Sequence, residues 1–261
     1  SAVMAGYSFQ IDLNTSFTGE DSFDVSLDAG NSSGNGIAEF DGNTDGDGLK
    51  VDGISYTFPV GSSTTVMVGD NMDGSSLFTT ACAYGGPSNT LDDCGNVNAG
   101  ITNGGAMIGA AYDFGNGFTA AAGYAGPENA IGTLESEDAY GFNAAYTADN
   151  YGISVTYGVV DQAEVADGAD NNAFAVNKYT AINAYYTADG LPSISAGYEF
   201  GDLGGAADTV DEQSSFFVGV SGDVGPGTAG VALGYSNVVE NADEEYMYEA
   251  FYSYPINDGM T

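Results

Sequence analysis

The stretch that decides the fold class is Tyr-Gly-Ile-Ser-Val-Thr-Tyr-Gly-Val at positions 151–159. Large apolar side chains alternate here with small or polar ones, and this period of two residues is typical of a β-strand whose two faces differ. The alternation recurs along the whole chain in about fourteen segments, many near the 9–11 residues of a tilted transmembrane strand. Other clear examples are 7–14, 22–28, 194–200 and 229–236.

The connections between these segments alternate in length. Tight turns rich in Gly, Asn and Asp occur at 114–118, 148–151, 188–191, 224–227 and 256–259. Longer acidic segments lie between them, at 126–138, 161–177, 201–213 and 236–245. Short turns at one end of the strands and long loops at the other are typical of outer-membrane barrels. The sequence therefore predicts an all-β protein, a transmembrane antiparallel β-barrel that occupies 1–261 as a single domain.

A soluble acidic β-sandwich or β-helix would also alternate apolar and polar positions. Two features favour the membrane barrel over it. The segments are longer than the roughly 5–6 residues typical of soluble strands. Their polar faces also carry many Gly, Ser, Thr and Ala residues instead of a charged mixture, and aromatic residues gather near the strand ends, as in the girdles of membrane barrels.

Charge excludes several classes of function. The 261 residues include 37 Asp and Glu but only two basic residues, Lys50 and Lys178, with no histidine, which gives a formal charge of -35. Two lysines cannot displace the counterions of a nucleic acid, so we expect no nucleic-acid partner. Without histidine or arginine, Ser-His-Asp catalysis, histidine zinc sites and arginine phosphate clamps lack their residues. We expect no enzymatic activity.

Six carboxylates lie within the predicted strands, at positions of the polar face. They fall on strand faces opposite the apolar residues, which places them in the lumen of a barrel. Carboxylates without basic partners attract cations and repel anions, which predicts a cation-preferring passage. For any one of them, a solvated carboxylate without influence on selectivity is the alternative. The pore-lining candidates are Asp12, Asp24, Asp28, Asp113, Glu199 and Glu249.

The segment 41–52 is similar in spacing to a calcium-binding loop. Oxygen ligands fall at its first, third and fifth positions, and Gly46 supplies the turn. An EF-hand, however, needs flanking helices and a glutamate at position 12, whereas strand-like segments flank this loop and an aspartate ends it. Ca²⁺ is therefore a candidate cofactor, and an ordinary acidic loop is the alternative. The candidate ligands are Asp41, Asn43, Asp45, Asp47 and Asp52.

Both cysteines, Cys82 and Cys94, lie in the longest loop, 71–104. An extracytoplasmic compartment favours a disulfide between them, worth about 3 kcal/mol by chain entropy. A metal site or a redox pair fits less well, because the C-x-x-C spacing and nearby histidines are missing.

Several stretches carry a resemblance to a known family. They are Ser16-Phe-Thr-Gly-Glu-Asp-Ser-Phe-Asp-Val-Ser-Leu-Asp-Ala-Gly-Asn31, and the segments 52–61, 84–95, 112–124 and 252–261. These resemble the barrel portion of cyanobacterial outer-membrane porins, which carry an N-terminal S-layer-homology domain, are related to carbohydrate-selective porins and are often labelled iron-uptake porins. The S-layer-homology region and a closing strand are missing from this sequence. We therefore expect a barrel truncated at both ends, with sixteen or more strands in the complete protein.

The resemblance implies a water-filled channel for passive diffusion of small hydrophilic solutes, such as inorganic ions, sugars or iron species. It implies an outer-membrane location in a Gram-negative-type bacterium of the cyanobacteria, contact with membrane lipid, and a homotrimer. In porins a long loop commonly folds into the barrel, so loop 71–104 is the candidate constriction. The alternative functions are an acidic β-rich structural protein of the cell surface and a Ca²⁺-dependent adhesion module that uses 41–52.

Overall fold

The structure is a computed structural model that describes residues 7–30, 48–86, 91–101, 105–133, 137–162, 175–204, 212–239 and 246–256. Strands are the only regular elements in these ranges. They are β1 (Ser8–Thr15), β2 (Ser22–Gly30), β3 (Lys50–Val60), β4 (Thr64–Asp70), β5 (Ala106–Gly115), β6 (Phe118–Gly126), β7 (Ala139–Thr147), β8 (Tyr151–Gln162), β9 (Ala175–Tyr186), β10 (Ser193–Asp202), β11 (Glu212–Val224), β12 (Gly227–Val239) and β13 (Met247–Ser253).

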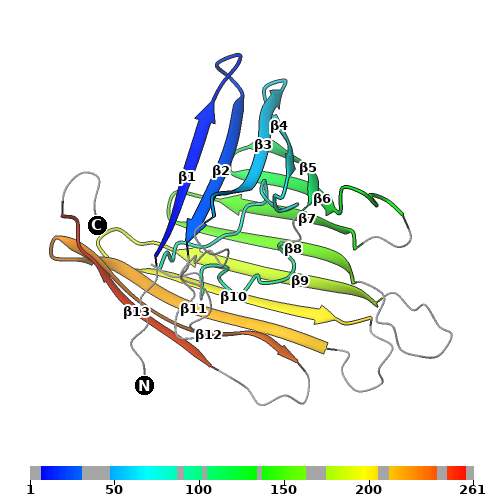
Figure 1. The fold of residues 1–261 in the computed structure, drawn as a ribbon. Coiled ribbons are helices and arrows are strands. Elements are labelled where there is room, and N and C mark those ends of the chain that lie inside the picture. Colours follow the sequence, from blue (N-terminus) through cyan, green and yellow to red (C-terminus); the bar gives the residue numbers. More distant parts are fainter. Residues whose placement is uncertain are drawn as a thin grey trace.

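All thirteen strands belong to one sheet in sequence order, and each pairs with its chain neighbours in antiparallel fashion. The sheet curls strongly, so that β1–β4 stand steeply against β9–β13 in Figure 1. β1 and β13 form the two edges of the sheet. The structure confirms an all-β antiparallel barrel wall, with thirteen described strands where the sequence pattern indicated about fourteen. A complete barrel of sixteen or more strands stays a prediction, as does truncation at both ends.

The connection lengths follow the predicted asymmetry. Short turns join β3 to β4, β5 to β6, β7 to β8 and β11 to β12, whereas long segments join β2 to β3, β4 to β5, β6 to β7 and β8 to β9. The β5–β6 turn has Asn116 at φ 55° and Gly117 at φ 85°. Two successive positive φ values match the right-handed twist of a tight hairpin, which explains the Asn-Gly pair at this position.

The two faces of the sheet differ as the alternation predicts. On β8, Ile153 is 48% exposed, whereas its neighbour Ser154 is 1% exposed. Large apolar side chains of the other strands share the outward face and its exposure, among them Phe142, Ile182 and Val231. An extended exposed apolar face of this kind is typical of a barrel wall in lipid.

Aromatic side chains gather at the two ends of the outward face. At the short-turn end, the ring of Tyr146 lies 4.5 Å from that of Phe118 and 5.8 Å from that of Tyr151, measured between centroids. Near the long-loop end, Phe216 and Tyr235 have ring centroids 5.8 Å apart. Two aromatic bands at opposite strand ends are the girdles that membrane barrels place at the lipid–water interfaces. No helix in the described ranges is long and apolar enough to cross a membrane.

The β1–β2 turn is built around Asp21. One carboxylate oxygen accepts hydrogen bonds from the Ser16 hydroxyl at 2.6 Å and from the Thr18 N–H at 2.8 Å. The other oxygen accepts from the hydroxyl of Tyr56 at 2.7 Å, which ties the turn to β3. The hydrogen bond from Ser16 contributes most to holding the pKa of Asp21 well below its usual range.

Candidate functional site

The candidate site is the connection between β4 and β5, whose described segments, 74–86 and 91–101, lie against the inward face of the sheet. We call residues 71–105 the inner loop, with an outbound limb at 74–86 and a return limb at 91–101. The outbound limb follows the inward faces of successive strands from β6 toward β13, and the return limb comes back beside it. A long connection folded inward narrows the space that the sheet surrounds.

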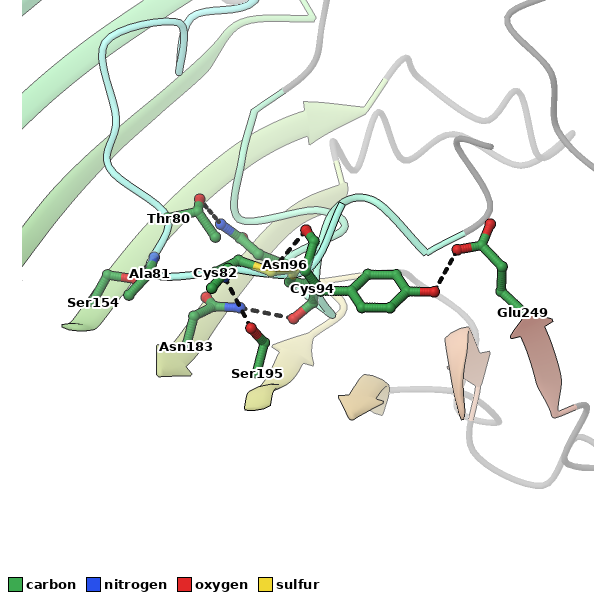
Figure 2. Close-up of a disulfide and its surroundings, with 11 residues drawn as sticks. Thr80, Ala81, Cys82, Cys94, Asn96, Ser154, Asn183, Ser195 and Glu249 are labelled. Carbon is green, nitrogen blue, oxygen red and sulfur yellow. Dashed lines mark hydrogen bonds between the residues drawn. A yellow bond between two sulfur atoms is a disulfide. The ribbon is translucent and has the colours of Figure 1, made fainter. Parts of the chain in front are cut away.

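Polar side chains of the sheet hold the outbound limb through its backbone. The N–H of Thr79 donates to Asn143 Oδ1 on β7 at 2.9 Å, and the N–H of Ala81 donates to Ser154 Oγ on β8 at 2.9 Å. The N–H of Ala83 donates to Ser195 Oγ on β10 at 2.8 Å (Figure 2). Every second amide of the limb therefore points at the sheet, which fixes the limb in an extended conformation across the strands.

The far end of the outbound limb is clamped between β11 and β13. The hydroxyl of Tyr84 donates to Glu249 Oε1 at 2.6 Å (Figure 2). Its ring meets Phe217 and Phe251 edge to face, with centroids 5.3 and 5.8 Å apart. Leu91 of the inner loop belongs to the same buried cluster. Aromatic burial and a hydrogen bond to a carboxylate together fix this end of the outbound limb.

The return limb is held by β9 and β10. Asn183 Nδ2 donates to the carbonyl of Cys94 at 2.8 Å. Glu199 Oε2 accepts the N–H groups of Asn98 at 2.8 Å and Ala99 at 2.7 Å, and Glu199 Oε1 accepts Asn98 Nδ2 at 2.6 Å. The Glu199 side chain is 1% exposed.

A disulfide joins the two limbs. Cys82 of the outbound limb and Cys94 of the return limb are bonded, with Cα atoms 6.4 Å apart (Figure 2). Both cysteines lie in or against the cluster around Tyr84. The structure thus contains the disulfide that the sequence predicts. The bond lies on the inward side of the sheet, between the two limbs of the inner loop.

A row of glycines makes room for the inner loop, and sequence reasoning missed it. Gly109, Gly123, Gly141 and Gly158 are direct partners across β5, β6, β7 and β8. A Cβ atom at Gly123 would overlap the carbonyl of Gly74, and one at Gly158 would lie 2.8 Å from the carbonyl oxygen of Ala99. Inward glycines at matching heights on neighbouring strands were the signal that could have located the loop.

The six predicted pore-lining carboxylates divide into three groups. Glu199 and Glu249 lie on the inward face and accept hydrogen bonds from the inner loop, Glu199 buried and Glu249 half-buried. Asp113 lies at the short-turn end, where Oδ1 accepts the N–H of Gly115 at 2.7 Å and caps the turn. The others, Asp12, Asp24 and Asp28, lie on the inward faces of β1 and β2.

These last three carboxylates form a column, which we call the acidic column. Asp24 and Asp28 are four residues apart on β2, and Asp12 on β1 pairs with Ser26 midway between them. Ser26 Oγ donates to Asp12 Oδ1 at 2.7 Å. Asp12 is exposed, and the two β2 carboxylates are half-buried. Since inward side chains recur about every 7 Å along a strand, the column extends over much of the wall.

The inner loop adds acidic groups that were not predicted as site residues. Asp73, Asp92 and Asp93 are exposed on it. Of the two basic residues, Lys50 pairs in register with Asp28 across β2 and β3, whereas Lys178 lies on β9 next to the buried Tyr179 and is exposed. The exposed charge on the inner loop is therefore acidic throughout its described residues.

The predicted calcium loop lies mostly outside the described residues. Asp41, Asn43, Asp45 and Asp47 fall there, whereas Asp52 is an exposed residue of β3 whose carbonyl accepts a hydrogen bond from Asn71 Nδ2. The ranges that the structure covers contain no group of three or more potential metal-ligating side chains. Calcium binding at 41–52 stays a prediction.

An antiparallel sheet with an apolar outward face, aromatic bands and an inward-folded loop has the fold of bacterial porins. Solved porin structures bear this out. A triple mutant of Rhodopseudomonas blastica porin matches with a TM-score of 0.59 and 15% identity, over 97% of this chain and 81% of that one. An anion-selective porin from Comamonas acidovorans matches with a TM-score of 0.58 and 17% identity, over 87% of this chain and 67% of that one. No protein-family model and no curated protein matches the sequence.

Proposed function

We propose that this protein is a porin, a water-filled channel for passive diffusion of small hydrophilic solutes across an outer membrane. The observation that carries the proposal is the inner loop, which side chains of β7, β8, β9, β10 and β13 hold by hydrogen bonds on the inward side of a lipid-compatible wall. A disulfide joins its two limbs. A loop fixed in this way sets the width of a passage. The porin fold of the solved relatives supports the same conclusion.

We further propose that the channel prefers cations. The support is the acidic column on β1 and β2 together with the acidic residues exposed on the inner loop. The chain has no arginine and a formal charge of -35, and Lys50, which lies in register with Asp28, is one basic residue beside three carboxylates. A passage lined by one sign of charge enriches ions of the opposite sign. The Comamonas acidovorans porin is anion-selective by its name, and the charge of this chain argues for the opposite preference.

Liposome swelling with neutral sugars of increasing size tests the channel itself. The purified protein, folded as judged by heat-modifiable gel mobility, is expected to admit small sugars and exclude larger ones. A matched control is the same protein boiled before reconstitution, which should admit none. Folded protein that is soluble without detergent and leaves liposomes sealed would favour the alternative, a structural protein of the cell surface.

The finer attributes rest on the sequence resemblance. They are a cyanobacterial origin, a homotrimer, and passage of inorganic ions, sugars or iron species. Calcium binding at 41–52 is a separate proposal, and isothermal titration with Ca²⁺ tests it. Absence of heat at millimolar calcium would remove calcium binding without affecting the channel.

A further inference from the structure

We propose that Glu199 is a positioning residue of the constriction, which fixes the return limb of the inner loop by accepting its hydrogen bonds and contributes no charge to permeation. The inference rests on the proposed channel function and deepens it. The sequence pattern placed Glu199 among the carboxylates that line the pore. Its surroundings in the structure give it a different role.

The carboxylate of Glu199 is saturated by the inner loop. Two consecutive backbone amides, those of Asn98 and Ala99, point at the same oxygen, and the amide of the Asn98 side chain points at the other. With 1% of the side chain exposed, water and permeating ions have almost no access to it. A buried backbone N–H must find an acceptor, and Glu199 supplies one for two amides at the point where the limb turns toward β5.

Neighbouring contacts show why one side chain controls this limb. Ala99 has no exposed surface, and its backbone lies directly over Gly158 of β8. Cys94, five residues earlier, lies over Gly197 of β10 and accepts the hydrogen bond of Asn183. In the segment that runs from Cys94 to Ala99, the Glu199 side chain accepts hydrogen bonds from the backbone N–H groups of the return limb. Loss of its oxygens would leave two N–H groups buried without a partner, so the limb would lift away from the sheet.

Three substitutions separate the acceptor role from the charge. Glu199→Gln keeps a carbonyl oxygen at the same distance from the backbone and removes the charge, and its amide can donate to Asn98 once that side chain rotates. Glu199→Asp keeps the charge but is one methylene too short to reach. Glu199→Ala removes both. Positioning therefore predicts that Gln behaves as wild type and Asp behaves as Ala, whereas a permeation charge predicts the reverse.

Amide hydrogen exchange of the full-length protein in detergent measures how firmly the return limb is held, independently of any transport activity. We expect the amides of Asn98 and Ala99 to exchange about tenfold or more faster in the Ala and Asp variants, and at the wild-type rate in the Gln variant. Ser195→Ala on the same strand is the matched control, because it should speed exchange at Ala83 and leave Asn98 unchanged. If Glu199→Ala fails to fold, the comparison of Gln with Asp still decides.

Bilayer recordings of the same variants supply the second reading. Under a salt gradient at or below about 0.1 M, where the screening length is about 10 Å or more and a permeation charge would be felt, Glu199→Gln is expected to keep the wild-type conductance and zero-current potential. The Asp and Ala variants are expected to show altered conductance with noisier open levels. A changed zero-current potential in Gln alone, or wild-type exchange in all three variants, would overturn the proposal. Supporting exchange data without any channel activity would instead refute the proposed function and leave the positioning role intact.

Discussion

The close approach of the return limb to Gly158 makes this glycine the sharpest test of how the inner loop is seated. In Gly158→Ala, the new methyl group would lie 2.8 Å from the carbonyl oxygen of Ala99 and 2.9 Å from its Cα atom. Nonbonded carbon contacts are best at about 3.5–4.0 Å, so one side must move by roughly 0.5–1 Å. β8 is hydrogen-bonded along its length to β7 and β9, whereas the limb is held by side chains. The limb will therefore move.

Overpacking of this kind costs about 1–3 kcal/mol. Because the Ala99 N–H bonds to Glu199, a shift of the limb also weakens that hydrogen bond. A cost of about 1–3 kcal/mol corresponds to about 5- to 150-fold faster exchange of the Ala99 amide. The protein should still fold and migrate as a heat-modifiable barrel, because the strand ladder is untouched. In bilayers we expect noisier single-channel currents than those of the wild type.

Gly109→Ala is the matched control. It lies in the same glycine row, but the nearest atoms to its added methyl group would be 3.7 Å away, an ordinary contact distance. Replacement of a glycine in a compatible conformation stabilises a protein by about 0.4–1 kcal/mol through the unfolded state. Wild-type exchange at Ala99 in Gly158→Ala, or equal disturbance by both substitutions, would refute the account of how the limb is seated.

Three further predictions concern the clamp, the disulfide and the β1–β2 turn. Tyr84→Phe keeps the ring but removes the hydrogen bond to Glu249, so we expect a local loss of about 1.5–3 kcal/mol, seen as faster amide exchange in the outbound limb. Replacement of both cysteines by serine should destabilise the protein by about 3 kcal/mol, because the disulfide no longer constrains the unfolded chain. We expect the double variant and the mildly reduced wild type to show the same change in conductance. Unchanged currents in both would show that the disulfide does not control the constriction. Asp21→Asn should lower the urea midpoint of unfolding at neutral pH, because the carboxylate accepts hydrogen bonds from three hydroxyls and the turn backbone. Because the pKa of Asp21 is depressed in the folded state, the carboxylate stabilises the fold above the unfolded-state pKa near 3.9. This stabilisation is lost as the pH falls from there toward the folded-state pKa. The difference between wild type and variant should therefore shrink below about pH 4, and a difference that grows in acid would contradict the assignment.

The faces of the strands were predictable because a period of two residues is a local property. Residues 151–159 point alternately outward and inward as their side chains require, and the Asn116-Gly117 pair marks its own turn. The same alternation placed Glu199 and Glu249 on the strand face opposite the apolar residues, and their role as pore-lining charges stays a prediction. Local pattern thus determined the wall, its two surfaces and the alternation of short and long connections.

The use of an inward side chain was not predictable in the same way. Whether Glu199 meets water or protein depends on the course of the inner loop, and its partner Asn98 lies 101 positions away in sequence. No periodicity encodes such a contact. The glycine row carries part of the information, since Gly109, Gly123, Gly141 and Gly158 align once the strand registers are known. Register must therefore be established before the loop can be placed.

The zero-current potential of the full-length protein in a planar bilayer, under a gradient of potassium chloride, tests the central claim most directly. A cation-preferring channel formed by this wall and its inner loop predicts stepwise currents and a dilute side that becomes positive. Conversion of Asp12, Asp24 and Asp28 to asparagine should move that potential toward zero, because it removes the acidic column. Folded protein that gives no steps would contradict the channel, and a dilute side that becomes negative would contradict its preference for cations.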